Sequence, residues 1–97
     1  MKNDIRDILN SENELYNYLI KNQMVDDLRA EIQALEDICA DYDEKIDEAD
    51  ANGEDKLADF YCGQLQKYDK KRIRLALEKN RIENELLTFE LNRYTED

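Results

Sequence analysis

The chain has 97 residues, with no proline, two glycines, 40% charged residues and a formal net charge of -11 at pH 7. So few turn-forming residues exclude a β-sandwich, a barrel or a multistranded sheet, because these folds need a turn every few residues. A hydrophobic content of 41% excludes a disordered tail in spite of the high charge. What remains is an all-α protein with a single domain over residues 1–97.

Several kinds of chemistry are absent from the sequence. There is no histidine, which removes the commonest general base and the commonest metal ligand, and there is no phosphate-binding loop or nucleophile elbow. Cys39 and Cys62 are too few for a disulfide framework, so we expect free thiols. No apolar run reaches the length of a signal sequence or a membrane span. We therefore expect a soluble cytoplasmic protein that is not an enzyme and holds no metal or cofactor.

Two helical segments are predicted in the first half of the chain. Apolar residues in the range 1–10 predict a short N-terminal helix. Ser11 and Glu14 then have the spacing of a capping box, which predicts that the first long helix covers residues 11–50. A helix that runs through Ser11 without a break is the alternative.

A heptad pattern runs along this first long helix. Its apolar positions recur at alternating spacings of three and four residues: Val25, Leu28, Ile32, Leu35, Cys39, Tyr42, Ile46 and Ala49. The apolar residues of the range 15–20 do not continue this seam, so we expect a kink or a phase shift near residues 21–23.

The range 51–53 is the predicted turn, and a second long helix is expected over 54–94. Gly53 can adopt the left-handed conformation that ends a helix. The second helix has its own seam: Ala58, Tyr61, Leu65, Tyr68, Arg72, Leu75, Lys79, Ile82, Leu86 and Phe89. When the two seams are paired outward from the turn, Tyr42 faces Tyr61 and Val25 faces Lys79. The paired residue numbers add to 103 or 104 throughout, which predicts an antiparallel helical hairpin, that is, a two-helix coiled coil.

The net charge divides unevenly between the two helices. Residues 1–55 carry 5 basic and 17 acidic side chains, whereas residues 56–97 carry 9 basic and 8 acidic ones. Ten carboxylates lie between positions 36 and 55 with Lys45 as the only basic residue: Glu36, Asp37, Asp41, Asp43, Glu44, Asp47, Glu48, Asp50, Glu54 and Asp55. A solvent-exposed coiled-coil face usually mixes both signs of charge, so this asymmetry indicates a binding surface for a basic partner. Acidity that serves only solubility is the alternative.

A basic cluster follows the turn over residues 67–74. We interpret it as a counter-charge for the acidic helix beside it, with Lys71 opposite Glu31, rather than as a nucleic-acid patch.

The range 48–59 loosely resembles the calcium-binding loop of the EF-hand family, with Gly53 at the sharp turn. The resemblance would imply a calcium site. However, Asp55 stands in place of an aliphatic residue, Lys56 occupies a ligand position and Asp59 is shorter than the usual glutamate. Because both seams run up to this turn, we interpret it as a plain helix reversal.

The second helix has another stripe opposite its seam. It consists of Ile73, Leu77, Asn80, Asn84, Leu87, Leu91 and Tyr94, again at alternating spacings of four and three. A lone two-helix hairpin cannot bury both faces of one helix. We therefore expect a homodimer of the four-helix type that pairs second helix with second helix, the asparagines setting the register. Folding back of residues 1–20 onto that face is the alternative.

Two functions fit this pattern. The first is a non-enzymatic acidic module that binds a basic, nucleic-acid-binding protein and inhibits or regulates it as a nucleic-acid mimic, without contacting nucleic acid or membrane itself. Small acidic proteins of phages and mobile elements, such as anti-CRISPR inhibitors, act in this way, and the analogy is one of class. The alternative is a structural coiled-coil adaptor or assembly protein.

Overall fold

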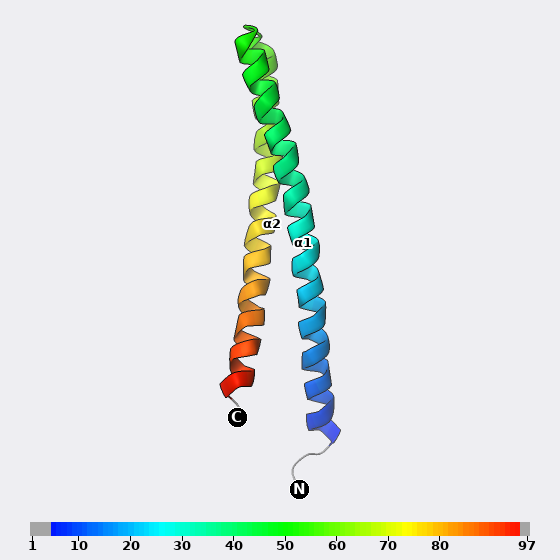
Figure 1. Ribbon diagram of the computed structural model, residues 1–97. Helices are drawn as coiled ribbons and strands as arrows, with labels where there is room; N and C mark the ends of the chain where they lie inside the picture. The colour runs from blue at the N-terminus through cyan, green and yellow to red at the C-terminus, as the bar shows by residue number, and fades with distance from the viewer. Residues whose placement is uncertain (1–4, 96–97) are drawn as a thin grey trace.

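In the computed structural model the chain is a hairpin of two long helices, α1 over Ile5–Ala51 and α2 over Asp55–Thr95. The structure describes the backbone of residues 5–95 and the side chains of residues 12–92. The hairpin is a rod with extents of 79 × 20 × 14 Å, with the turn at one end and both chain ends at the other (Figure 1). The predicted antiparallel hairpin is therefore confirmed.

The turn between the helices is closed by a Schellman motif. Glu54 donates its backbone N–H to the carbonyl of Ala49 at 2.8 Å, and Gly53 donates to the carbonyl of Asp50 at 3.1 Å. Gly53 has φ 72°, the left-handed conformation that this motif needs. The Glu54 carbonyl then accepts the first backbone hydrogen bond of α2, from Ala58. The turn falls one residue later than predicted, between the end of α1 at Ala51 and the start of α2 at Asp55.

The core is a narrow seam between the two helices. Seven hydrophobic side chains are buried among the described residues: Val25, Ile32, Leu35, Ala49, Ala58, Ile82 and Leu86. All seven belong to the two predicted seams. Tyr42 also lies in the seam, with its ring centroid 6.0 Å from that of Tyr61 and 5.8 Å from that of Tyr68.

The register of the two seams differs from the prediction by about one helical turn at the open end. Val25 packs against Ile82, and Tyr18 stacks on Phe89 with centroids 4.9 Å apart. Both pairs have residue numbers that add to 107. This register buries Ile82, which is 1% exposed, and lets the Lys79 ammonium bind Glu83 at 2.8 Å. Burial of the apolar side chain outweighs the pairing that the spacing alone suggested.

The N-terminal third also differs from the prediction. The structure has no separate helix over residues 1–10, since α1 is uninterrupted from Ile5, and residues 1–4 lie outside the described part. Helical structure also continues through residues 21–23, and residues 12–20 extend α1 instead of folding back onto α2. This stretch contains no proline or glycine, the two residues that most disfavour a helix interior. The helical hydrogen bonds therefore continue through it.

The seam keeps its phase through this region. Lys21 and Tyr18 continue the alternating spacing back from Val25, and both contact α2. The apolar side chains that suggested a phase shift remain exposed to water at 41 to 64%: Leu15, Tyr16, Leu19 and Ile20.

The conformation of Gly53 makes it the more sensitive of the two glycines. Gly53→Ala is expected to lower the free energy of unfolding by about 1–2 kcal/mol, because an L-residue is strained in the left-handed region. Gly63 lies inside α2, and a Cβ there meets no atom within 4 Å. Gly63→Ala is expected to raise the free energy of unfolding by about 0.5–1 kcal/mol. Urea unfolding of both variants checks this pair, and destabilisation by both would contradict it.

Ile82 is the most deeply buried side chain. Ile82→Ala is expected to lower the free energy of unfolding by about 2–5 kcal/mol, because it leaves a cavity beside Val25 and Leu86. Ile38, which is 37% exposed, is the matched control, and Ile38→Ala should cost less than about 1 kcal/mol. Equal losses in chemical denaturation would show that the seam is not centred on Ile82.

Candidate partner-binding surface

The ten predicted carboxylates lie together at the turn end of the rod. Glu36 to Asp50 occupy the last part of α1, while Glu54 and Asp55 lie at the start of α2. Every one of the ten is exposed. We call this group the acidic tip.

The acidic tip has a high linear density of charge. Between Glu36 and Asp50, eight carboxylates follow one another along 15 residues of helix. At about 1.5 Å per residue this is one negative charge per roughly 3 Å of helix axis. One strand of a DNA duplex has a phosphate about every 3.4 Å. The tip therefore resembles a nucleic-acid strand in its axial charge density.

No ion pair neutralises the acidic tip among the described residues. None of the ten carboxylates takes part in an ion pair there, although Asp37 accepts a hydrogen bond from Gln33 at 3.1 Å. Lys45, the one basic residue of this stretch, places its ammonium 5.2 Å from the ring centre of Tyr42 and 5.8 Å from that of Tyr61. Its charge is therefore directed to aromatic faces in cation–π contacts.

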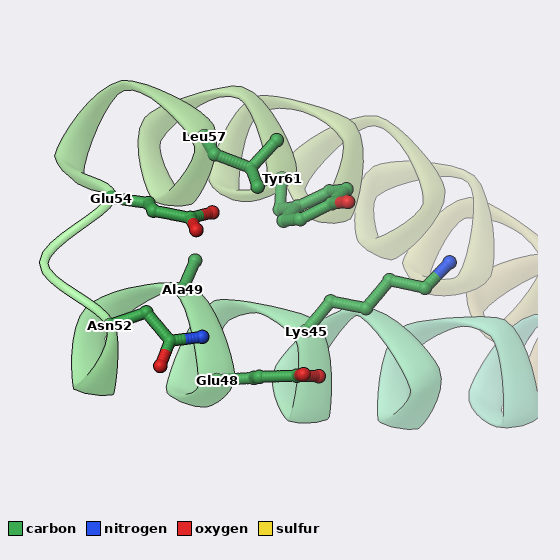
Figure 2. A pocket seen from close by; sticks show the side chains of 7 residues that line it. All are labelled: Lys45, Glu48, Ala49, Asn52, Glu54, Leu57 and Tyr61. Atoms are coloured by element: carbon green, nitrogen blue, oxygen red, sulfur yellow. The ribbon is translucent and has the colours of Figure 1, made fainter.

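A shallow hollow lies inside the turn. Lys45, Ala49, Glu54, Leu57 and Tyr61 contribute to its lining, together with Glu48 and Asn52 (Figure 2). Glu48 and Glu54 approach it from α1 and from the turn, and Tyr61 and the Lys45 chain form its wall toward the middle of the rod. Polar and charged side chains therefore line this hollow together with Ala49, Leu57 and Tyr61.

The basic cluster of α2 forms no direct ion pair with α1 among the described residues, although the charge of Glu36 is one of the causes that raise the pKa of Arg72. Among residues 12–92, no ion pair joins Lys67, Lys70, Lys71 or Arg74 to any carboxylate, and the predicted pair of Glu31 with Lys71 is not formed. The ion pairs that do join the helices have the opposite polarity, with the cation on α1. They are Lys21 with Glu85 at 2.9 Å and Arg29 with Glu83 at 3.7 Å.

Arg72 occupies a seam position and is neutralised within its own helix. Its Nε and Nη2 donate to the same Asp69 carboxylate oxygen at 3.0 and 2.8 Å. The hydrogen bond and charge of Asp69 raise the pKa of Arg72 above its usual value. Burial, together with the negative charge of Asp69, raises the pKa of the nearby Cys39 thiol. Cys39 and Cys62 are both free, as predicted, and Cys39 is the less reactive for its raised pKa.

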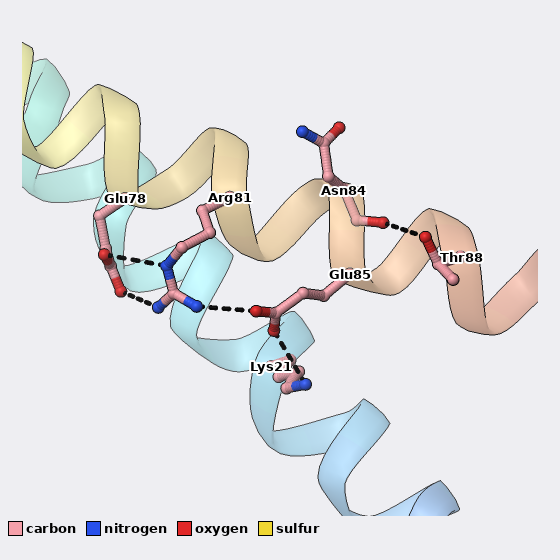
Figure 3. Close-up of polar contacts among 6 residues, drawn as sticks. All are labelled: Lys21, Glu78, Arg81, Asn84, Glu85 and Thr88. Carbon is pink, nitrogen blue, oxygen red and sulfur yellow. Dashed lines mark hydrogen bonds and ion pairs between the residues drawn. The ribbon is translucent and has the colours of Figure 1, made fainter.

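A charged network lies at the open half of the hairpin (Figure 3). Arg81 binds Glu78 and also Glu85, and the other oxygen of Glu85 binds Lys21 of α1. The hydrogen bond from Lys21 is the main cause that lowers the pKa of Glu85, and the hydrogen bond from Lys79 lowers the pKa of Glu83 in the same way. The ion pairs that join the two helices, among the residues the structure describes, thus lie in the open half of the hairpin, away from the turn.

The second predicted surface, on the outer side of α2, is exposed to water. Ile73, Leu77, Leu87 and Leu91 are 45 to 65% exposed, and Asn80 and Asn84 are exposed as well. We call these six residues the outer stripe. The seventh predicted member, Tyr94, has a side chain outside the described residues. A further apolar patch, missed by the sequence analysis, consists of the exposed residues 15–20 of α1, whose apolar spacing was its only signal.

The structure offers no other site of recognisable chemistry. No group of three or more cysteine or carboxylate side chains among the described residues could hold a metal ion, and the range 55–59 of the EF-hand-like segment is part of α2. Within the same residues, no helix is apolar enough over a sufficient length to cross a membrane. Comparison with family models, with curated proteins and with solved structures finds no match to this chain.

The lowered pKa of Glu85 predicts a pH dependence. The carboxyl titrates near its ordinary value of 4.5 in the unfolded chain and below it in the fold. The stabilisation is therefore complete above the ordinary value and is lost as the pH falls through the lowered one. Glu85→Gln should reduce the free energy of unfolding more at pH 7 than at pH 3.

Glu44 provides the matched control for this prediction, since it belongs to the unpaired acidic tip. Glu44→Gln should raise the free energy of unfolding at pH 7, because it removes one repelling charge. Urea unfolding at both pH values checks the pair of variants. A loss at pH 3 as large as that at pH 7 for Glu85→Gln would contradict the assignment to its ion pairs.

Proposed function

We propose that this protein is a non-enzymatic binding module whose acidic tip occupies a nucleic-acid-binding channel of a basic partner protein and thereby inhibits or regulates it. The observation that carries the proposal is the absence of ion pairs at the tip. Ten exposed carboxylates stand on a rigid helix and turn, with no basic side chain of α2 bound to them.

Electrostatics supports a basic partner in particular. A cleft lined with lysine and arginine attracts a dense row of negative charges and speeds their encounter. Because the tip carboxylates are already free, binding breaks no internal ion pair. Carboxylates that are concentrated at one end of the rod fit this proposal better than carboxylates spread over the whole surface for solubility.

A second proposal concerns assembly. The outer stripe has four large apolar side chains in water, and surfaces of this kind usually mark an interaction site. We propose that two copies pair through this stripe, α2 against α2, as a four-helix-type homodimer. The stripe begins at Ile73, toward the open end, so pairing there leaves the acidic tip uncovered. Assembly as the sole function, with acidity for solubility only, is the competing proposal.

Neutralising the tip tests the first proposal. The tip variant combines Asp41→Asn, Glu44→Gln, Asp47→Asn and Glu48→Gln. Proteins captured from the native cells by the unmodified chain at about 50 mM salt should include a nucleic-acid-binding protein whose capture falls steeply by about 300 mM. The tip variant should capture it at least ~10-fold less well. The unmodified chain should also displace labelled nucleic acid that is bound to that partner.

A matched control removes the same number of charges elsewhere. It combines Glu12→Gln, Glu14→Gln, Asp27→Asn and Glu31→Gln, all of them exposed and without an ion pair among residues 12–92. This variant should capture the partner as the unmodified chain does, and circular dichroism should show both variants helical. Equal capture by the tip variant, or simultaneous binding of chain and nucleic acid, would reject the proposal and favour assembly as the sole function.

A further inference from the structure

The outer stripe is symmetric about Ile82. Its six positions, 73, 77, 80, 84, 87 and 91, have spacings of 4, 3, 4, 3 and 4, and their residue types read the same in both directions as apolar, apolar, Asn, Asn, apolar, apolar. A stripe of this kind is complementary to itself when the partner helix runs in the opposite direction. We infer that two copies pair through α2 as an antiparallel dimer, with a two-fold axis beside Ile82. The inference rests on the proposed dimer and specifies its geometry.

The antiparallel arrangement brings like residues into the same layer. Ile73 meets Leu91 of the second copy, Leu77 meets Leu87, and Asn80 meets Asn84, since each pair is equidistant from Ile82. The Asn84 side chain points away from α1, where a second helix would lie (Figure 3). Paired asparagine amides bind one another at the centre of the interface, and a shift by one layer would leave them against leucine. The asparagines therefore fix this register.

A parallel pair would also match the stripe with itself, and charge decides between the two directions. Residues 69–81 of α2 have six basic and two acidic side chains, net +4, while residues 83–95 have three acidic and one basic, net -2. Antiparallel pairing places the positive half of each copy against the negative half of the other, whereas parallel pairing places like charges together. By the same equidistance from Ile82, Arg74 lies in the layer of Glu90 of the second copy and gains a counter-charge there, whereas it has no ion pair among the described residues of its own chain.

The acidic tips favour the same direction. Residues 36–55 contain ten acidic side chains and one basic one, net -9. A parallel dimer would hold two such tips side by side. In the antiparallel dimer Gly53 lies 29 residues of helix from Ile82, so the two turns are about 90 Å apart at about 1.5 Å per residue. That distance is many times the Debye length of roughly 8 Å at physiological salt. The dimer would thus carry one free acidic tip at each end.

Arg81 and Glu83 are the charged residues closest to the proposed axis, where each would approach its own copy. Glu78 and Glu85 bind the Arg81 guanidinium within α2. Lys79 and Arg29 bind the Glu83 carboxylate in the same way. Like charge at the centre of the interface is thereby avoided.

Disulfide trapping tests the direction. Cys39→Ser and Cys62→Ser provide a cysteine-free background, into which Ile73→Cys or Leu91→Cys is introduced, one of the two chains being tagged. When the chains are mixed and oxidised, the antiparallel dimer should give the mixed disulfide between Ile73→Cys and Leu91→Cys. Each variant alone should give little, because like positions lie about 27 Å apart along the helix.

Donor and acceptor dyes at Asn52→Cys, in the same background, provide a second readout that leaves the stripe intact. Tips about 90 Å apart should show no energy transfer in the dimer. Efficient transfer, together with self-disulfides of each stripe variant, would show a parallel dimer and overturn the inference while the proposed dimer stands.

Sedimentation of the unsubstituted chain separates the remaining outcomes. A dimer that Leu77→Glu converts to monomer, with the helical signal retained, supports the interface. A monomer at all concentrations would overturn both the dimer and its geometry. Neither result changes the test of the acidic tip, because its neutralised variant leaves the stripe unaltered.

Discussion

Two helices bury only the narrow strip along which they touch, and this limit determines the rest of the molecule. With seven hydrophobic side chains buried in the described seam, most of the remaining surface of both helices is in water. Each outer face must therefore be polar, or be covered by another chain. α1 is polar toward the turn through its carboxylates, whereas α2 keeps an apolar stripe toward the open end. The outer face of α1 near the turn is therefore charged and that of α2 near the open end is apolar, although both helices have an apolar seam.

The distribution of ion pairs follows from the same geometry. Charges that flank the seam at the open half pair across it, as Lys21 does with Glu85. Near the turn the seam is lined by Tyr42, Tyr61 and Tyr68, whose rings hold the helices together without ion pairs. Carboxylates there can remain unneutralised at little cost to the fold, because aromatic packing replaces the electrostatic contact. A surface available for binding is thus compatible with a stable hairpin.

Much of this architecture could be predicted from the sequence, because heptad spacing and one left-handed glycine specify a hairpin almost alone. The acidic tip was predicted as well, since it depends only on which residues lie near the turn. The register at the open end was not, because pairing by residue number could not weigh burial of Ile82 against burial of Lys79. The path of residues 12–20 was not predicted either, because there the helix continues unbroken and leaves apolar side chains exposed to water. Spacing shows which side chains share a face, but not whether anything covers that face.

Both ends of the described chain lie at the same end of the rod, opposite the turn. Tension applied between them would load the seam contacts one layer at a time, beginning with Tyr18 and Phe89 and proceeding toward Gly53. A structure loaded in this way unzips at low force, whereas helices pulled from opposite ends would have to break all layers together. The hairpin is therefore mechanically weak along one direction while remaining a stiff spacer along its length.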